Sequence, residues 1–421
     1  MHIVVATLAG RELASMTAEA AWTRREVCSR IPKLEGPLLR TARLLHGGAE
    51  VSDETSLGAL GVADGACLQL MFDVRGGLEL LTASGDTTAK LWSAATGECV
   101  FTLEGHRGKV YSAVFSPDCL LLLTASSDYT ARLWSGVSGE CVYTFEGHGN
   151  YVTSAVFSAD GQRVLTASDD CTAKLWLVSS GSCLHTLRGH GNSVYTAVFA
   201  PDGATVLSAS KDGTAKLWTA DTAECLHTLE EYRTHVCSAT LSPDGASVLT
   251  AYDDGTARMF AAATGRCLRV FERHHESVNW AAFSPDCSLV TTASDDRTAK
   301  IWSAAAGHCL RTLRHGDDVV CAMFSPDGAL LLTAAEDDLV KLWSVESGEC
   351  LHAVVAEGEG IAPADFSPDG AMVLTASGAG AANLWRAASG ECVRILEGHR
   401  TAVLSVAFSP PLPPAQVHAL G

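Results

Sequence analysis

Residues Thr130–Trp134 (TARLW) form a phrase that recurs along the chain and decides its fold. The aromatic residue that closes the phrase returns at Trp92, Trp134, Trp176, Trp218, Phe260, Trp302, Trp343 and Trp385. Consecutive members lie 42 residues apart, with a single interval of 41 between Trp302 and Trp343. A period near 40 residues, with several short strands in each unit, is typical of propeller blades. Repeats of this kind present binding surfaces more often than chemistry.

The repeat from Lys109 to His148 predicts four antiparallel strands joined by tight turns. From inside to outside, the expected strands are Val110–Phe115 (VYSAVF), Leu120–Ser126 (LLLLTAS), Thr130–Trp134 (TARLW) and Cys141–Phe145 (CVYTF). Turn residues separate them, among them Ser116-Pro117-Asp118. One such sheet cannot bury both of its faces, so neighbouring sheets must stack on it and the ring must close.

The two ends of the repeat region complement each other. The first repeat begins at its second strand, Leu78–Ser84, and has no inner strand of its own. The last segment, Ala402–Phe408, is an inner strand without a blade. We therefore predict a mainly β protein with an eight-bladed propeller over residues 78–410, in which residues 402–408 complete the first blade. Residues 411–421, which are rich in proline, are expected to be a disordered tail.

The composition limits the classes of partner. The chain has 421 residues, of which 47% are hydrophobic, and a formal net charge of −18. Binding to nucleic acid or to an anionic membrane needs clustered Lys and Arg, so we expect neither partner. No apolar run approaches the length that spans a bilayer, and the apolar first residues lack the basic segment of a signal peptide. We expect a cytoplasmic location, with a nuclear one as the alternative.

Eight of the fifteen cysteines occupy one repeated strand position. They follow each blade-closing aromatic residue by seven positions, at Cys99, Cys141, Cys183, Cys225, Cys267, Cys309, Cys350 and Cys392. Equivalent positions of neighbouring blades are expected to lie beyond the roughly 7 Å Cα–Cα limit for a disulfide. We therefore expect free thiols that serve as small apolar residues in a reducing compartment.

The recurring phrases Gly-His, Ser-Pro-Asp-Gly, Ser-x-Asp-x-Thr-Ala-Lys-Leu-Trp and Thr-Gly-Glu-Cys resemble the WD-repeat family of β-propellers. The strict Trp-Asp ending is absent. The resemblance implies a hydrogen-bonded tetrad of His, Ser or Thr, Asp and Trp in each blade. Mapped here, the tetrads are His399, Thr82, Asp86 and Trp92; His106, Thr124, Asp128 and Trp134; His148, Thr166, Asp170 and Trp176; His190, Ser208, Asp212 and Trp218; His274, Thr292, Asp296 and Trp302; and His315, Thr333, Asp337 and Trp343.

Two blades depart from the tetrad pattern. The fifth has Tyr232 in place of His and Phe260 in place of Trp. The eighth has Glu357 for His and Ala379 for Asp, and Pro363 interrupts its inner strand because it lacks an N–H. We expect these two sheets to be the softer ones.

In WD-repeat relatives the narrow top rim, built by the start of the inner strand and the turn between strands two and three, is the usual binding face. The corresponding residues here are Lys109, Tyr111, Tyr151, Thr153, Asp169, Tyr195, Lys211, His235, Asp253, Asn279, Asp295 and Glu336, whereas blades eight and one offer only Ala362, Ala402 and Leu404. Aromatic and charged side chains at such positions suit peptide recognition. Since Asp253, Asp295 and Glu336 lie on consecutive blades, we expect a basic or Arg-containing peptide there; the alternative is a merely solvated face.

Upstream of the repeats, residues 1–74 resemble a ubiquitin-like (β-grasp) domain. The cues are the opening M-x-I-x-V-x-T-L-x-G, helix-like composition over Thr17–Ile31, strands at Arg43–Gly48, Thr55–Leu57 and Leu68–Phe72, and the following Val74-Arg75-Gly76-Gly77. The resemblance places a recognition patch at Leu8, Leu45 and Met71, with Gln69 where ubiquitin has histidine. An exposed apolar cluster would serve ubiquitin-pathway receptors, unless these side chains are buried.

Other features of the sequence suggest functions of other classes. Cleavage after Gly77 would release the first domain as a modifier, but the first blade begins at once. Asp169-Asp170, Asp253-Asp254 and Asp295-Asp296 look like acid–base pairs, yet no nucleophile or base accompanies them. Cys183-x-His185, Cys225-x-His227 and Cys350-x-His352 offer two ligands per blade where zinc wants four. We predict a non-enzymatic interaction scaffold without metal or cofactor, with a structural subunit of an assembly as a further alternative.

Overall fold

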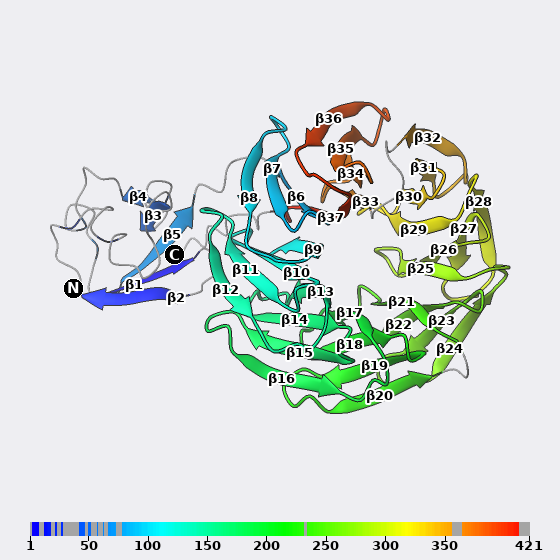
Figure 1. The fold of residues 1–421 in the computed structure, drawn as a ribbon, viewed down its shortest axis with the longest axis horizontal. Helices are drawn as coiled ribbons and strands as arrows, with labels where there is room; N and C mark the ends of the chain where they lie inside the picture. The colour runs from blue at the N-terminus through cyan, green and yellow to red at the C-terminus, as the bar shows by residue number, and fades with distance from the viewer. Residues whose placement is uncertain are drawn as a thin grey trace, which may run out of the picture.

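The computed structural model describes residues 2–7, 12–17, 22, 27, 42–46, 49–51, 57, 62, 66–72, 78–230, 234–355 and 364–411. Within residues 78–411, eight four-stranded antiparallel sheets stand around a common centre (Figure 1). We number these blades 1 to 8 in chain order, beginning with the sheet that contains β6. The mainly β fold and the eight-bladed propeller that the sequence predicts are confirmed.

The strands of each blade run from the centre outward. The inner strands of blades 1 to 8 are β37 (Val403–Phe408), β9 (Val110–Phe115), β13 (Val152–Phe157), β17 (Val194–Phe199), β21 (Val236–Leu241), β25 (Val278–Phe283), β29 (Val319–Phe324) and β33 (Ala364–Phe366). The second strands are β6 (Glu79–Ser84), β10 (Leu121–Ser126), β14 (Arg163–Ser168), β18 (Thr205–Ser210), β22 (Ser247–Tyr252), β26 (Leu289–Ser294), β30 (Leu330–Ala335) and β34 (Met372–Ala376).

The outer half of each blade repeats in the same way. The third strands are β7 (Ala89–Ser93), β11 (Ala131–Ser135), β15 (Thr172–Leu177), β19 (Thr214–Thr219), β23 (Thr256–Ala261), β27 (Thr298–Ser303), β31 (Leu339–Ser344) and β35 (Ala381–Arg386). The outer strands are β8 (Cys99–Leu103), β12 (Cys141–Phe145), β16 (Cys183–Arg188), β20 (Cys225–Glu230), β24 (Cys267–Glu272), β28 (Cys309–Arg314), β32 (Cys350–Val355) and β36 (Cys392–Glu397).

Blade 1 is assembled from both ends of the repeat region. The antiparallel register pairs Val403 with Ser84 and Phe408 with Leu80, and in Figure 1 the red β37 lies beside the blue β6. Ser409 N donates to the carbonyl of Glu79 at 2.9 Å, and Glu79 N donates to Ser409 Oγ at 3.0 Å. The closing strand predicted from the sequence is therefore confirmed.

The hydrophobic core lies between the blades. Side chains alternate along a strand, so neighbouring residues face opposite blades. Leu122 packs with Leu81 and Leu91 of blade 1, whereas Leu123 packs with Val152 and Val164 of blade 3. Because both faces of each sheet are covered, every blade depends on its two neighbours.

The inner strand of blade 8 is short, as expected of the blade with Pro363. β33 has three residues, against six in the inner strands of the other blades. Pro363 itself lies outside the described residues, as do Tyr232 and Glu357. The expectation that blades 5 and 8 are softer remains a prediction.

The described strands before residue 78 form a separate mixed sheet. Its strands are β1 (His2–Thr7), β2 (Glu12–Thr17), β3 (Ala42–His46), β4 (Ala49–Val51) and β5 (Ala66–Phe72), in the order β2-β1-β5-β3-β4. β1 and β5 are parallel, and the other pairs are antiparallel.

The helix predicted over residues 17–31 is wrong at two points. Thr17 ends β2, because it pairs with His2 across a hairpin, and Trp22 lies outside any helix. Val27 is helical, and Leu57, expected in a strand, lies in a turn. Within the described ranges no helix is long and apolar enough to cross a membrane.

The eight repeated cysteines are free thiols on the outer strands. Seven are exposed and Cys309 is partly buried, so they do not act as buried apolar residues. Each thiol instead lies near the carbonyl two residues on, as Cys99 Sγ does at 3.3 Å from Phe101 O. Their position at the start of an outer strand, with no further strand beyond it, explains the exposure.

Asp365 is an unusual residue of the inner wall. Its position on β33 corresponds to Val114, Val156 and Val198 of other blades, and its carboxylate accepts a hydrogen bond from Phe408 N at 3.4 Å. Burial raises the pKa of Asp365 to about 6, although the bonds from Phe408 N and Phe366 N oppose the rise. A carboxylate therefore stands between the last blade and the closing strand.

We expect replacement of Asp365 by Asn to stabilise the propeller at pH 8. The raised pKa means that the folded state binds this proton more tightly than the unfolded state, so stability is lost as pH rises through 6. The uncharged amide keeps an acceptor for Phe408 N and should add about 1 to 2 kcal/mol at pH 8 and little at pH 4. Urea unfolding of both proteins across this pH range is the measurement. An equal difference at both pH values would contradict the prediction.

Candidate functional site

In each complete tetrad, one hydroxyl of the second strand bonds both the histidine that precedes the inner strand and the tryptophan of the third strand. In blade 2, His106 Nε2 lies 2.7 Å from Thr124 Oγ1, and Trp134 Nε1 donates to the same oxygen at 2.8 Å. His106 Nδ1 lies 2.8 Å from Asp128 Oδ2. Asp128 also accepts from the Thr130 hydroxyl and from Arg107 N, so its carboxylate fastens the turn between β10 and β11.

The same bonds recur in blades 1, 3, 4 and 6. The His Nε2 to hydroxyl distances are 2.7 Å for His399 and Thr82, 2.8 Å for His148 and Thr166, 2.8 Å for His190 and Ser208, and 2.7 Å for His274 and Thr292. The Trp Nε1 to hydroxyl distances are 2.9 Å for Trp92, 2.9 Å for Trp176, 2.8 Å for Trp218 and 2.9 Å for Trp302. The His Nδ1 to Asp distances are 3.0 Å for Asp86, 2.8 Å for Asp170, 2.9 Å for Asp212 and 2.8 Å for Asp296.

Blade 7 holds a looser tetrad. His315 and Trp343 both bond Thr333, at 2.7 Å each. His315 Nδ1, however, is 3.6 Å from Asp337 Oδ1, which is beyond hydrogen-bond distance. Asp337 instead accepts from Gly316 N at 2.7 Å.

In blades 1, 4 and 6 the pKa of the tetrad histidine and that of the tetrad aspartate are both lowered, which favours a neutral histidine beside an ionised aspartate. Burial lowers the pKa of His274 to about 4, against the opposing charge of Asp296. Burial alone would raise the pKa of Asp86, but bonds from Thr88, Arg400 N and His399 outweigh it and lower the pKa to about 2. Such satisfied networks stiffen a sheet.

Blade 5 replaces the tetrad with different contacts. Phe260 has no N–H, and the last residue of β22 is Tyr252 where most blades have Ser. Tyr252 is fully buried, and the guanidinium of Arg258 lies over its ring at 4.8 Å from the centroid. Arg258 also pairs with Asp254 at 3.2 Å.

Several residues expected at the top rim bridge neighbouring blades instead. In three blades the second residue of the inner strand donates a hydrogen bond to the carbonyl of the first residue of the next blade's inner strand. Tyr195 donates its hydroxyl to Val236 O, Asn279 Nδ2 donates to Val319 O at 3.3 Å, and Thr153 Oγ1 donates to Val194 O at 3.0 Å. Their polar atoms thus fasten one blade to the next, and peptide binding by these three residues stays a prediction. Burial also raises the pKa of Tyr195.

An exposed tyrosine cluster lies on blades 2 and 3. The ring of Tyr151 is 6.4 Å from Tyr111 and 5.7 Å from Tyr129 between centroids, and Tyr129 and Tyr151 are 46% and 42% exposed. Tyr129 was missed from the sequence. It occupies the strand two–three turn at φ 74°, where no other blade carries an aromatic residue (the others have Thr, Cys, Gly, Arg or Asp), and that contrast was the available signal.

Acidic residues gather on the rim of blades 5 to 7. We call Asp253, Asp295, Asp318 and Glu336 the acidic rim. His235 binds Asp253 at 2.8 Å, and Asn279 donates to Asp295. Burial and the negative charges of Asp295 and Asp317 raise the pKa of Asp318, although Arg297 opposes them.

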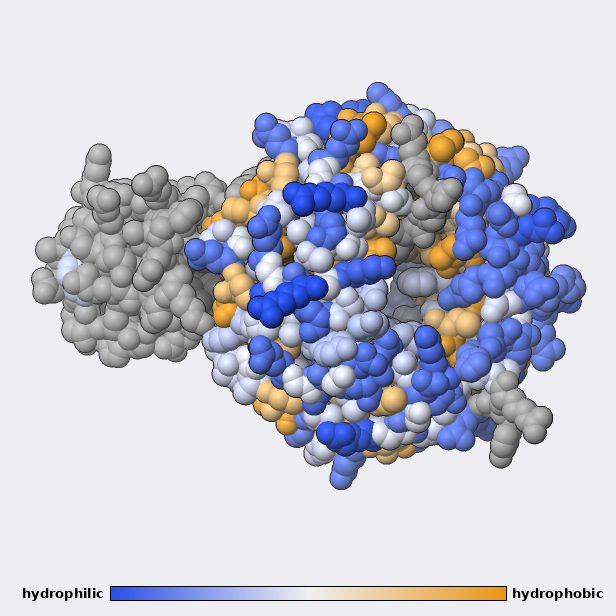
Figure 2. Space-filling model, in the orientation of Figure 1, coloured by the Kyte–Doolittle hydropathy of each residue, from blue (hydrophilic) through white to orange (hydrophobic). Residues whose placement is uncertain are grey.

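The other residues predicted at the top rim differ in how exposed they are. Lys109, Lys211, His235, Asp253 and Glu336 are exposed, and Asp169, Asp295, Ala402 and Leu404 are partly buried. Ala362 lies outside the described residues. The face in view in Figure 2 is mostly hydrophilic and is hollowed at its centre.

Several of the candidate acid–base and metal-binding residues make structural contacts. Asp170 and Asp296 belong to tetrads, and Asp254 bonds Thr256 and Arg258. His227 and His352 do not face their neighbouring thiols: each Nε2 lies 3.1 Å from a carbonyl of the next blade, Ala263 O and Ala388 O. Within the ranges the structure describes, no group of three or more His, Cys, Asp or Glu could hold a metal ion.

The expected patch of the first domain is only partly placed. Leu8 lies outside the described residues. Leu45 is in β3 opposite Gln69 of β5, and Met71 of β5 is opposite Arg43. Leu45 and Met71 are thus brought onto adjacent strands.

The family description "WD domain, G-beta repeat" (WD40) matches residues 97–135, 139–176, 181–219, 223–260, 265–303, 307–344 and 390–411. These matches cover more than half of the chain, which therefore belongs to the WD40 family. Each match joins the outer strand of one blade to the next blade, and residues 345–389 are passed over, where blade 8 departs from the tetrad pattern. A search of curated proteins found no matching relative. WD40 propellers bind protein partners and are typically non-enzymatic scaffolds.

Proposed function

We propose that the protein is a non-enzymatic adaptor whose propeller holds a basic peptide on the acidic rim. The observation that carries the proposal is the gathering of Asp253, Asp295, Asp318 and Glu336 at the same end of the consecutive blades 5, 6 and 7. Burial and the negative charges of Asp295, Asp317 and Glu276 raise the pKa of Asp318. Crowded carboxylates of this kind gain from a nearby cation. The tyrosine cluster adds exposed aromatic surface of the kind enriched at peptide interfaces.

Charge reversal on the acidic rim tests this function. We expect the triple change Asp253→Lys, Asp295→Lys and Glu336→Lys to weaken binding of a short fluorescent Arg/Gly peptide by about tenfold or more, measured by anisotropy. The matched control reverses Glu140, Glu230 and Glu272, which are exposed at the outer strands and give the same net charge. Equal weakening by both triples would show that only overall charge matters and would remove the proposed site.

We further propose that residues 1–74 form a ubiquitin-like domain that docks to ubiquitin-pathway receptors through Leu8, Leu45 and Met71. The five-strand order with parallel β1 and β5 supports the β-grasp resemblance. Binding of the full chain to an immobilised ubiquitin receptor, lost on Leu45→Ala, is the expected result. We place this activity in the cytoplasm or the nucleus, where the outer thiols stay reduced.

Two alternatives keep their own tests. A modifier precursor would be cut after Gly77, but Glu79 N is already bonded to Ser409 in blade 1. Incubation with a ubiquitin-specific peptidase, followed by mass spectrometry, tests for this cleavage. A chain that stays intact would contradict the modifier alternative. A structural subunit would instead co-purify with partners at fixed stoichiometry.

A further inference from the structure

Blade 8 lacks a lysine–threonine hydrogen bond between its third and outer strands that four other blades contain. In four blades a lysine of the third strand donates to the threonine opposite it on the outer strand. These pairs are Lys90 and Thr102 at 2.8 Å, Lys174 and Thr186 at 2.9 Å, Lys216 and Thr228 at 2.9 Å, and Lys300 and Thr312 at 3.5 Å. The register of blade 8 puts Asn383 opposite Ile395 at this position. The sheet thus loses both its cation and the hydroxyl that received it.

The same region of blade 8 has lost further side-chain volume. Ala379 stands where other blades have the tetrad Asp, and Ala381 stands where most have the Thr that bonds it. A cavity of about 460 Å³ results, lined by Val355, Ala379, Ala381, Asn383, Trp385 and Ile395 among others. This volume lies within the range of about 300 to 1,000 Å³ that is usual for ligand pockets.

Asn383 is the polar group that this cavity leaves unsatisfied. Its side chain is 5% exposed, and its Oδ1 has no hydrogen-bond partner among the described residues. A buried carbonyl oxygen without a partner is costly, so it favours a ligand that brings an N–H donor. Glu397 also lines the cavity and supplies negative charge.

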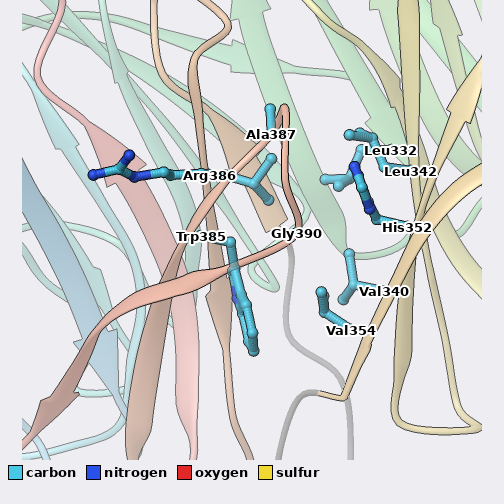
Figure 3. Close-up of a pocket in the computed structure, with 10 residues that line it drawn as sticks. Leu332, Val340, Leu342, His352, Val354, Trp385, Arg386, Ala387 and Gly390 are labelled. Carbon is cyan, nitrogen blue, oxygen red and sulfur yellow. The ribbon is translucent and has the colours of Figure 1, made fainter.

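Trp385 gives the cavity an aromatic wall. It is partly exposed, whereas the tetrad tryptophans of the other blades are at most 7% exposed, and its Nε1 is already bonded to Thr375 at 2.9 Å. Figure 3 shows Trp385 facing Val340 and Val354 of blade 7 across the gap between the two sheets. That gap encloses only about 20 Å³ on this side, so the larger space lies toward Asn383 and Ile395.

Two other blades, 2 and 7, place a cation of their own over the corresponding tryptophan ring. The guanidinium of Arg132 lies 5.9 Å from the Trp134 centroid, and Lys341 Nζ lies 5.7 Å from that of Trp343. Within the described ranges no Lys or Arg lies over Trp385 or lines the cavity. The described lining of the cavity therefore supplies acceptors and an aromatic face, but neither Lys nor Arg.

We propose that this cavity is a socket for an arginine side chain of a partner peptide. The guanidinium stacks on Trp385, donates to Asn383 Oδ1 and pairs with Glu397, and its methylene stem packs on the exposed Val355 and Ile395. Arginine suits the site better than lysine because its planar head can stack and donate several bonds at once. The socket lies in blade 8 and is distinct from the acidic rim of blades 5 to 7.

The test titrates the full chain with N-acetyl-arginine methylamide and with its citrulline counterpart, which has nearly the same shape without the charge. Binding is followed by calorimetry and ligand-observed NMR. We expect the arginine compound to bind at least about tenfold more tightly than the citrulline compound. The double change Asn383→Lys and Ile395→Thr restores the pair of the other blades and fills the socket, so it should abolish binding while the melting temperature stays level or rises.

Matched variants locate the site. Glu397→Gln should weaken arginine binding severalfold, whereas Glu230→Gln, at the same register position of blade 4, should leave it unchanged. The triple reversal on the acidic rim should also leave it unchanged, which separates this proposal from the proposed function. No binding of the arginine compound, equal binding of the citrulline compound, or unaltered binding to the double variant would each overturn the socket.

Discussion

A chain that stops after Arg400 should fail to form a stable propeller. The truncation removes β37, and with it Val403, Val406 and Phe408, which are buried at 1%, 8% and 7% exposure between blade 1 and blade 8. Burying three such side chains contributes about 5 to 8 kcal/mol, which is comparable to the whole stability of many folded proteins. The open second strand of blade 1 would in addition expose an unpaired edge that invites aggregation.

Size-exclusion chromatography and thermal unfolding measure this outcome. We expect aggregates or a chain without a cooperative transition. A chain that ends after Pro411 is the control, because it keeps β37 together with Ser409 and should melt like the full protein. A soluble monomer with an unchanged melting temperature after truncation at Arg400 would show that the ring does not need its closing strand.

Thr292→Val should be one of the most damaging single substitutions in the chain. The hydroxyl of Thr292 receives both His274 Nε2 at 2.7 Å and Trp302 Nε1 at 2.9 Å, and all three side chains are buried. Valine has the same shape without the oxygen, so two buried polar groups lose their partner at once. We expect a loss of about 2 to 5 kcal/mol in the free energy of unfolding.

The repeat supplies a matched control in blade 5. Thr250 occupies the same strand position, but its hydroxyl donates to the carbonyl of Arg258 at 3.3 Å, and Phe260 has no N–H to offer. Thr250→Val should therefore cost about 1 kcal/mol or less. Urea unfolding of the two variants gives the comparison, and equal losses in blades 5 and 6 would contradict a special role for the tetrad.

The propeller architecture was predictable because the sequence repeats at a nearly constant interval. Seven tryptophans and Phe260 mark the third strands, and the unmatched ends at Leu78 and Phe408 predict their own pairing. The tetrads followed from family resemblance and chain position. The early part of the chain was harder, since a helix-like composition over residues 17–31 does not show where β2 ends.

The binding site was less predictable, because the position of a residue on the rim does not determine the direction in which its side chain points. Tyr195 and Asn279 lie near the start of their inner strands, as expected for the top rim. Their polar side-chain atoms, however, donate hydrogen bonds to the inner strand of the next blade. The socket of blade 8 was missed for a related reason. Asn383 and Ile395 are twelve residues apart, and only the strand register shows that they replace a lysine–threonine pair.

The shared first blade has a consequence for synthesis on the ribosome. Glu79 and Ser409, which bond each other, are separated by 330 residues of chain. At translation rates of about 5 to 20 residues per second, β6 to β8 wait roughly 15 to 70 s for their fourth strand to emerge. During that interval the nascent blade offers an open edge and two uncovered apolar faces, so chaperone demand should concentrate there until the final residues leave the exit tunnel.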